Sequence, residues 1–237
     1  MVWLWRLYLY WAFFWFGLAM LLLSPFLVLP YYALPKLTAA RFSWQFMRLW
    51  AAVFTFPIGG VSFQRIGIQP TANAIYIANH NSYLDTPALA FCMPSAMRFL
   101  AKDSLIKFPV FGFIYKHLVI AVNRHSAKSR AQSLEQMRYW LKLGMPVLLF
   151  PEGRMNIGNE ILQPFHSGAF QLAKEFDLPI IPLVIKGTRS VLPASHFALR
   201  PGKISVEVMP SLFPNQYSSH EEMMQAAYLL MVEKYAV

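Results

Sequence analysis

Seven short apolar runs alternate with helical patterns between residues 61 and 208, and this alternation limits the available folds more than any other feature of the chain. The runs have the length of strands, and several end in polar or turn-forming residues. The predicted strands are Val61–Ile68, Ala74–Ala78, Met97–Ala101, Val119–Asn123, Val147–Phe150, Ile180–Ile185 and Lys203–Val208. The predicted helices are Tyr83–Cys92, Ser104–Lys116, Ala127–Leu143, Ser167–Phe176 and Ser219–Tyr235. We therefore predict an α/β fold, with a mixed, largely parallel sheet flanked by helices.

The first 33 residues are almost entirely apolar. The run Leu7–Leu23 has seventeen residues without a charge, and as a helix it would span about 26 Å against a hydrocarbon core of roughly 30 Å. Such a helix can cross a bilayer or lie half-embedded in it. A secretory signal peptide is the competing interpretation, but no small-residue cleavage site follows Leu23. Pro25 and Pro30 are expected to end the helix.

A second helix is expected over residues Thr38–Phe56. Arg41, Gln45 and Arg48 lie on one face at steps of four and three, and aromatic and aliphatic residues cover the rest. A narrow cationic stripe on a broad apolar surface favours a helix at a membrane interface. The alternative is a core helix whose arginines extend to the solvent.

Composition and charge favour an anionic membrane surface as a partner. Hydrophobic residues make up 57% of the chain and charged residues 14%, against about 25% charged in soluble domains. The net charge is +10, and no acidic residue precedes Asp85, which favours the cytoplasmic face of a membrane. The only cysteine, Cys92, excludes an internal disulfide and a four-cysteine metal site.

A proline- and glycine-containing break, Pro57-Ile58-Gly59-Gly60, separates the two parts of the chain. We predict N-terminal membrane-anchoring helices over residues 1–57 and a globular domain over residues 58–237.

The most informative polar segment, Ala78-Asn79-His80-Asn81-Ser82-Tyr83-Leu84-Asp85, follows a predicted strand. Loops at the rim of a sheet often carry chemistry. If a helix begins near Ser82 or Tyr83, the Asp85 carboxylate lies in its first turn and can fold back toward the His80 ring. A carboxylate that holds one imidazole nitrogen leaves the other free to act as a base. A purely structural role for the pair is the alternative.

Two further strands end in charged groups. The residues at their exits are Arg124, Glu152, Gly153 and Arg154. Ligands of open α/β sheets bind outside the carboxyl ends of the strands, and two guanidinium groups there suit a phosphorylated ligand. Arg124 as a solvated strand end, and Glu152 paired with Arg154 at the surface, are the alternatives. Pro179 and Pro182 in the next predicted strand could mark the edge of the sheet.

The ordered set Asn79-His80-x4-Asp85, Arg124, Phe150-Pro151-Glu152-Gly153 and Pro179-Ile180-Ile181-Pro182 resembles the glycerolipid acyltransferases, more narrowly the bacterial 1-acyl-glycerol-3-phosphate acyltransferases. The resemblance covers about residues 60–210. It implies transfer of a fatty acyl chain from acyl-CoA or acyl-carrier protein to the free hydroxyl of 1-acyl-glycerol-3-phosphate, giving phosphatidic acid for phospholipid biosynthesis. It implies neither a metal nor a bound cofactor. Members with an N-terminal two-helix membrane motif are known, and residues 1–57 resemble one.

The same resemblance implies roles for individual residues. His80 would be the general base for the acceptor hydroxyl, and Asp85 would orient it. Arg124, Glu152 and Gly153 match positions that bind the glycerol and phosphate of the acceptor, and we place Arg154 with them. Pro182 falls in the block associated with the acyl chain. Backbone amides near Asn81–Tyr83 are candidate donors to the oxyanion.

Two departures from the family pattern leave the acceptor open. Arg154 follows Gly153 directly, where members often have Thr and then Arg, and Leu118 stands where a glycine often begins the second block. Arginine directly after the glycine also occurs in relatives that acylate complete lysophospholipids. The same reaction on another lysophospholipid or a lyso-aminolipid is therefore one alternative function.

Two alternatives come from other classes: a membrane-anchored lipid-binding protein without catalysis, and a metal-dependent hydrolase. His117, His125 and His166 lack the spacing of metal ligands, so we predict no metal site. The basic residues match no motif that reads nucleic acid, so none is expected as a partner. The predicted partners are an anionic lipid surface, a lysophospholipid acceptor and an acyl-CoA or acyl-carrier protein, at the cytoplasmic face of a bacterial inner membrane.

Overall fold

One seven-stranded sheet forms the centre of the computed structural model, which describes residues 2–55, 58–68, 73–158, 160–194 and 198–236. The strands are β1 (Val61–Ile66), β2 (Ile75–Ala78), β3 (Arg98–Lys102), β4 (Val119–Val122), β5 (Val147–Leu149), β6 (Ile180–Lys186) and β7 (Gly202–Val208). Their order is β1-β7-β6-β2-β5-β3-β4. Strands β6, β2, β5, β3 and β4 run parallel, whereas β7 is antiparallel to β6 and parallel to β1.

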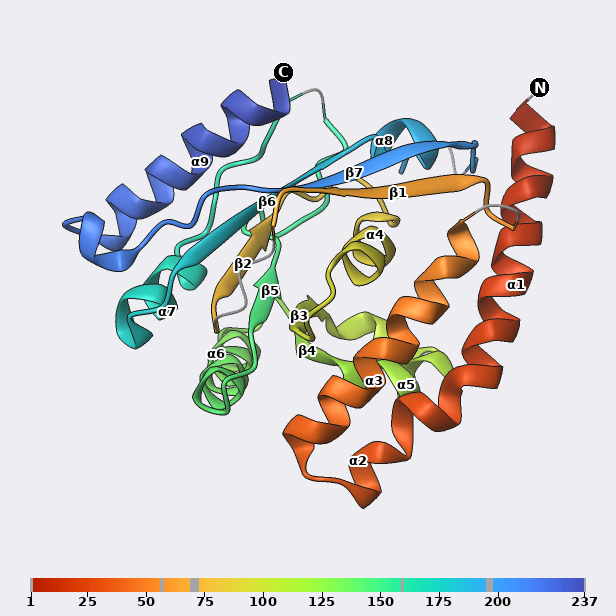
Figure 1. Cartoon of the computed structure of the whole chain (residues 1–237), viewed down its shortest axis with the longest axis horizontal. Helices are drawn as coiled ribbons and strands as arrows, with labels where there is room; N and C mark the ends of the chain where they lie inside the picture. Colours follow the sequence, from red (N-terminus) through yellow and green to blue (C-terminus); the bar gives the residue numbers. More distant parts are fainter. Residues whose placement is uncertain (1, 56–57, 69–72, 159, 195–197, 237) are drawn as a thin grey trace.

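The predicted fold class is confirmed, because helices cover both faces of this mixed, mostly parallel sheet (Figure 1). All seven predicted strands are present, with ends that differ by two residues at most. The α-helices are α1 (Val2–Val28), α2 (Pro30–Ala33), α3 (Lys36–Ala51), α4 (Asp85–Cys92), α5 (Phe111–Leu118), α6 (Ala127–Lys142), α7 (Gly168–Phe176), α8 (Thr188–Val191) and α9 (His220–Ala236).

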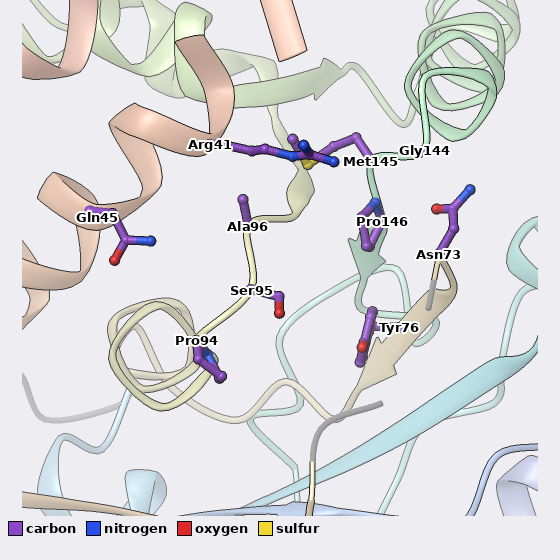
Figure 2. Close-up of a pocket in the computed structure, with 10 residues that line it drawn as sticks. All are labelled: Arg41, Gln45, Asn73, Tyr76, Pro94, Ser95, Ala96, Gly144, Met145 and Pro146. Atoms are coloured by element: carbon purple, nitrogen blue, oxygen red, sulfur yellow. The ribbon is translucent and has the colours of Figure 1, made fainter. Parts of the chain in front are cut away.

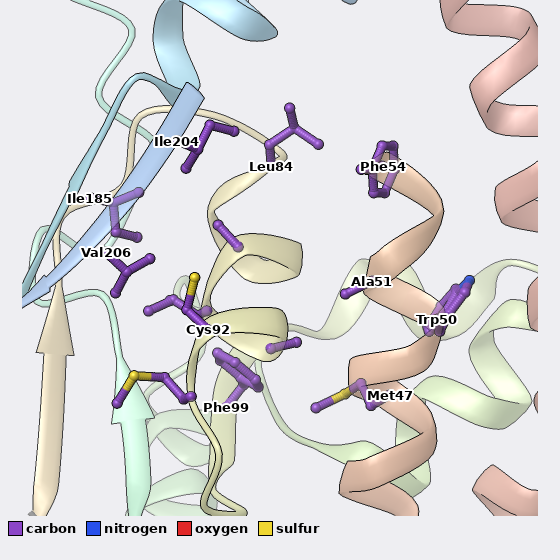
Figure 3. Close-up of a cluster of buried hydrophobic side chains, with 14 of the residues drawn as sticks. Met47, Trp50, Ala51, Phe54, Leu84, Cys92, Phe99, Ile185, Ile204 and Val206 are labelled. Atoms are coloured by element: carbon purple, nitrogen blue, oxygen red, sulfur yellow. The ribbon is translucent and has the colours of Figure 1, made fainter. Parts of the chain in front are cut away.

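The side chains of β2 alternate between two apolar layers. Tyr76 and Ala78 belong to the layer formed with α1, α3, α4 and α5, and Ile75 and Ile77 belong to the layer formed with α6, α7 and α9. All four are fully buried. In the first layer, Cys92 lies between the sheet and α3 (Figure 3). The loop after β2 therefore leaves the most enclosed strand of the molecule.

Helix α1 is longer than predicted because Pro25 lies inside it. Pro25 has no N–H for the carbonyl of Leu21, and the Ser24 hydroxyl donates to that carbonyl instead, at 2.8 Å. The prediction that Pro25 ends the helix is therefore wrong. Pro30 begins α2, since the first turn of a helix does not need the missing N–H.

Helix α3 packs between α1 and α4, as the core-helix alternative expects. Trp44 and Trp50 are buried, and their indole N–H groups donate to the carbonyls of Met93 and Phe16 at 3.1 and 3.0 Å. The helix ends at Ala51 and continues as a short 3-10 turn to residue 54. Residues 56 and 57, which the predicted helix end and domain boundary include, lie outside the described residues.

Strand β6 is central, so the interpretation of Pro179 and Pro182 as markers of an edge strand is wrong. The Pro182 carbonyl accepts the N–H of Met209 at 2.9 Å. On this side the pairing shifts by one residue between Leu183↔Val208 and Ile180↔Leu212. Proline is tolerated at such an irregularity because the ladder does not need its N–H there.

The helices agree with the predictions less closely than the strands. The segment predicted as one helix over 104–116 is a 3-10 turn, Asp103–Lys107, followed by α5. Helix α8 was not predicted. Helix α9 begins as its Ser and Glu residues indicate: the Ser219 hydroxyl accepts the N–H of Glu222 at 3.2 Å, and the Glu222 carboxylate accepts the N–H of Ser218 at 2.6 Å.

Candidate active site

His80 and Asp85 meet at the carboxyl end of β2. Helix α4 begins at Asp85, so this carboxylate lies in the first turn. The Nδ1 atom of His80 and the Oδ2 atom of Asp85 are 2.8 Å apart. The Asp85 side chain is fully buried, while 17% of the His80 side chain is exposed. An ionised carboxylate only accepts hydrogen bonds, so Nδ1 carries the proton and Nε2 carries a lone pair.

The Asp85 carboxylate is fixed by the loop that it closes. Its Oδ2 atom also accepts the backbone N–H groups of Asn81 at 2.6 Å and Ser82 at 2.8 Å. These bonds hold the carboxylate in place at the start of α4. The expectation that the amides near Asn81–Tyr83 face the oxyanion is therefore wrong for Asn81 and Ser82, whose N–H groups are already used.

The rest of the loop is tied to β6 and to the chain beyond it. The side-chain amide of Asn79 donates to the Ile185 carbonyl at 2.9 Å and accepts the Ile185 N–H at 2.7 Å, as a neighbouring strand would. The Ser82 hydroxyl donates to the Leu192 carbonyl at 2.7 Å. Phe150, the residue after β5, stacks on the His80 ring with centroids 4.1 Å apart. The imidazole therefore has a fixed position and orientation.

Glu152 holds the backbone of His80. Its two carboxylate oxygens accept the N–H groups of His80 and Gln163, both at 2.8 Å. The side chain is buried, and burial raises the pKa of Glu152 although the two amides act in the opposite direction. Glu152 does not pair with Arg154 as the surface alternative expected, since the Arg154 guanidinium donates to the Gln163 side chain at 2.8 Å.

Gly153 is required by the shape of the turn after β5. Its φ is +70°, and an added Cβ would lie 2.6 Å from Cδ2 of His166. The His166 N–H donates to the carbonyl of Pro151 at 2.8 Å. A larger residue would therefore have a strained backbone at this position and would collide with the His166 ring.

Arg124 lies on the same rim but farther along the sheet. It follows β4, the edge strand, and β3 separates β4 from β5. Burial lowers the pKa of Arg124, and the neighbouring Tyr115 of α5 acts against this. Arg124 and Arg154 thus follow different strands of the same rim, with β3 between them.

Comparison with known proteins identifies the family. The family model described as "Acyltransferase" matches residues 62–186. This chain belongs to the acyltransferase family.

Among the relatives of this acyltransferase are proteins named 1-acyl-sn-glycerol-3-phosphate acyltransferase. One from Chlamydomonas reinhardtii is 34% identical over 71% of the chain and 51% of its own length, so the chain spans about half of that relative. One from Salmonella typhimurium is 31% identical over 69% of the chain and 67% of its own length.

The fold has a solved counterpart. The crystal structure of the 1-acyl-sn-glycerophosphate (LPA) acyltransferase PlsC from Thermotoga maritima superposes with a TM-score of 0.80, at 21% identity, and covers 99% of the chain and 95% of that protein. At this identity the likeness concerns the fold.

Several residues that contact the candidate site or its neighbours were not predicted. Asn156 donates its N–H to the His80 carbonyl at 2.6 Å, and the Arg189 guanidinium donates to the Asn156 carbonyl at 2.7 Å. The Asn81 side chain donates to the Tyr235 hydroxyl of α9 at 3.1 Å. After β6 the chain has Gly187 and, two residues later, Arg189, much as Gly153 and Arg154 come after β5. A glycine and an arginine at the end of a strand could therefore have identified Arg189 from the sequence.

Lys102 was also missed, although it is the last residue of β3 and lies on the rim between Glu152 and Arg124. Lys102 directly follows the predicted strand Met97–Ala101, and the same signal identified Arg124.

Among the described residues, no three His, Cys, Asp or Glu side chains gather in a way that could hold a metal ion. Pro182 pairs with Ile77 of β2 inside β6, so it does not lie at the strand end that forms the rim.

Proposed function

We propose that this acyltransferase moves a fatty acyl chain from acyl-CoA or acyl-carrier protein to the free hydroxyl of 1-acyl-glycerol-3-phosphate, giving phosphatidic acid. The observation that carries the proposal is the 2.8 Å hydrogen bond between His80 and Asp85, which leaves Nε2 of a partly exposed imidazole as the base. The names of the relatives support the acceptor and the reaction class.

In the proposed reaction, Nε2 of His80 takes the proton of the acceptor hydroxyl while that oxygen attacks the thioester carbonyl carbon. The tetrahedral intermediate then collapses, the C–S bond breaks, and the leaving thiolate takes the proton from Nε2. Asp85 keeps Nδ1 protonated and stabilises the imidazolium that forms between the two proton transfers. The acceptor hydroxyl is the nucleophile, so the enzyme needs no acyl-enzyme intermediate.

The acceptor phosphate would lie toward the cationic part of the rim. Arg124, with Lys102 beside it, supplies positive charge at the ends of β4 and β3, and Arg154 supplies it beyond β5. Guanidinium groups bind phosphate through paired hydrogen bonds. Glu152 and Gly153 would contribute by fixing the shape of the loop around His80. Pro182 would contribute to acyl-chain binding by setting the position of β6.

A membrane surface would bring the acceptor to this rim. The helical stretch Trp3–Ala33 is the one described segment long and apolar enough to cross a membrane, and 17% of its most apolar window is buried. Large apolar side chains are exposed along it, among them Trp3, Tyr10, Phe14 and Leu22. We propose that this surface attaches the enzyme to the cytoplasmic face of the bacterial inner membrane, as part of the membrane-anchoring unit 1–57.

A second acceptor is favoured by one observation. The Arg154 guanidinium is bonded to Gln163 and Arg124 lies two strands from β5, so the cations leave room for a larger headgroup than a phosphate monoester. The same reaction on another lysophospholipid is therefore the second candidate function.

One acceptor panel tests both candidates. The full chain is incubated with labelled acyl-CoA or labelled acyl-carrier protein, and with 1-acyl-glycerol-3-phosphate, lysophosphatidylethanolamine or lysophosphatidylglycerol. We expect the fastest transfer to 1-acyl-glycerol-3-phosphate. Faster transfer to a complete lysophospholipid would replace the first candidate by the second, and no transfer to any acceptor would remove both in favour of a lipid-binding protein.

A further inference from the structure

A second cationic hollow lies between α3, α4 and β1, at the opposite end of α4 from Asp85. Its volume is about 330 Å³, within the range of roughly 300–1,000 Å³ that is typical of small-molecule sites. Arg48 reaches it from α3, Arg65 from the edge strand β1, and Cys92 is the last residue of α4. The remaining lining residues are Phe63, Phe91 and Pro94. Acyl transfer at His80 uses none of these residues.

The two arginines of this hollow have no acidic partner among the described residues that line it. The Nη1 atom of Arg48 donates to the Gln45 side chain at 3.3 Å, while its buried Nε atom has no hydrogen-bond partner in the described part of the chain. Burying a guanidinium N–H without an acceptor is costly, so this side of the hollow is suited to an added acceptor.

Glu207 of the neighbouring strand β7 does not neutralise the charges of Arg48 and Arg65. Arg65 is paired with Val206 across to β7, and the next residue, Glu207, points to the opposite face because side chains alternate along a strand. Glu207 forms an ion pair with Lys234 of α9 there, at 2.8 Å. The hollow is therefore positively charged as well as open.

The hollow also has an apolar wall, formed by the rings of Phe63 and Phe91 with centroids 5.2 Å apart. Beside Arg48 on α3, Leu49 is exposed, and α3 packs against α1 with its exposed apolar side chains. A ligand with a phosphate and an adjoining apolar chain combines the two chemistries that the hollow presents.

A neighbouring hollow provides an internal comparison. It shares Pro94 with the first hollow and is lined by Arg41 and Gln45 of α3, which lie opposite Asn73 at the start of β2 (Figure 2). Its described lining residues include a single cation and no aromatic pair. Arg41 thus lies on the same helix as Arg48 and carries the same charge, but lines a different hollow.

We propose that Arg48 and Arg65 bind the phosphate group of an anionic membrane phospholipid, whose charge no cationic headgroup offsets, at a site separate from His80 that holds the protein on the membrane. The proposal is independent of the acyl transfer proposed above. The same cations would accept free inorganic phosphate, so the test compares the two sources.

The single cysteine of the chain serves as the reporter, because Cys92 lines the hollow. Burial raises the pKa of its thiol to about 11, and the positive charges of Arg65 and Arg48 act in the opposite direction. A bound phosphate would cover the thiol and neutralise those charges, so both effects would slow its reaction with a disulfide reagent.

The experiment measures the rate of Cys92 modification in the full chain, in neutral detergent micelles, against increasing dihexanoyl-phosphatidylglycerol. Dihexanoyl-phosphatidylcholine and inorganic phosphate are titrated in parallel. We expect saturable protection by the anionic lipid and little protection by the zwitterionic one. R48Q and R65Q should each raise the protecting concentration by about tenfold, the effect of losing one charged hydrogen bond. R41Q should leave it unchanged.

Equal protection by both lipids would overturn the proposal, because the site would then not select an anionic lipid. An equal effect of R41Q and R48Q would also overturn it, since only net charge would matter. Protection by inorganic phosphate at the same concentrations would support the anion site and assign it to free phosphate. Arg65 is an exposed residue of an edge strand, so R65Q keeps the test valid if R48Q unfolds, and urea midpoints report folding. Because the readout is thiol chemistry, loss of acyl transfer leaves the result unaffected.

Discussion

The loop after β2 and the cations after β3 and β4 belong to the same rim of the sheet, but they are held in opposite ways. In the loop, one oxygen of Asp85 accepts three hydrogen bonds, and the backbone N–H of His80 is held by Glu152. At the end of β4, the bonded group of Arg124 is its backbone carbonyl, which accepts from Arg130 at 2.7 Å. The proposed base is therefore positioned by the fold alone, whereas the Arg124 side chain makes no hydrogen bond within the described part of the chain and is left for the proposed ligand.

The largest effect is expected at the centre of the rigid loop. His80→Ala should lower kcat by roughly 10³–10⁴-fold, because a positioned general base contributes up to that amount. Urea unfolding should change little, since the imidazole is partly exposed. The matched control is His125→Ala, an exposed histidine beside Arg124, which should keep full activity. Retained acyl transfer in His80→Ala would remove this residue as the base.

Asp85→Asn tests whether the loop orients the imidazole. The asparagine NH₂ can donate to Nδ1 of His80, which would move the ring proton to Nε2 and remove the base. We expect a loss of roughly 10²–10³-fold in kcat with little change in KM. An unchanged kcat would mean that the carboxylate only supports the loop.

The contrast between the two regions also explains what the sequence could predict. Apolar strands that end in polar residues are visible in a sequence, so the seven strands and the positions of His80, Glu152 and Arg124 on one rim followed from it. The His80–Asp85 spacing also indicated their contact. These signals are local, because each depends on a few consecutive residues.

Contacts made by distant segments could not be predicted in this way. Tyr235 reaches Asn81 from the C-terminal helix, and no local pattern links them. The amides of Asn81 and Ser82 bond to Asp85 rather than facing a substrate, and this depends on the loop conformation. Pro25 was misread because the Ser24 hydroxyl satisfies the carbonyl that proline leaves free.

A smaller effect is expected at the less constrained cation. Arg124→Ala should raise the KM for 1-acyl-glycerol-3-phosphate by about tenfold or more, the cost of one charged hydrogen bond, and should leave the KM for the acyl donor nearly unchanged. Steady-state kinetics with each substrate varied in turn measure the two constants. Equal increases in both would assign Arg124 to the structure of the rim instead of the phosphate.

The smallest effect is expected at Glu152, and it concerns stability. At low pH both side chains are neutral and have nearly the same shape, so Glu152→Gln should change the unfolding free energy there by no more than about 1 kcal/mol. Burial raises the pKa of Glu152 above its ordinary value of 4.5. The folded state therefore holds this proton more tightly than the unfolded state, and the wild type should lose stability as the pH rises through the raised pKa. The glutamine variant lacks this loss, so at neutral pH it should have the larger unfolding free energy of the two proteins. Paired urea unfolding curves measure it. A glutamine variant that is the less stable protein at neutral pH would show that the amides of His80 and Gln163 outweigh burial, and would place Glu152 among the stabilising charges of the rigid loop.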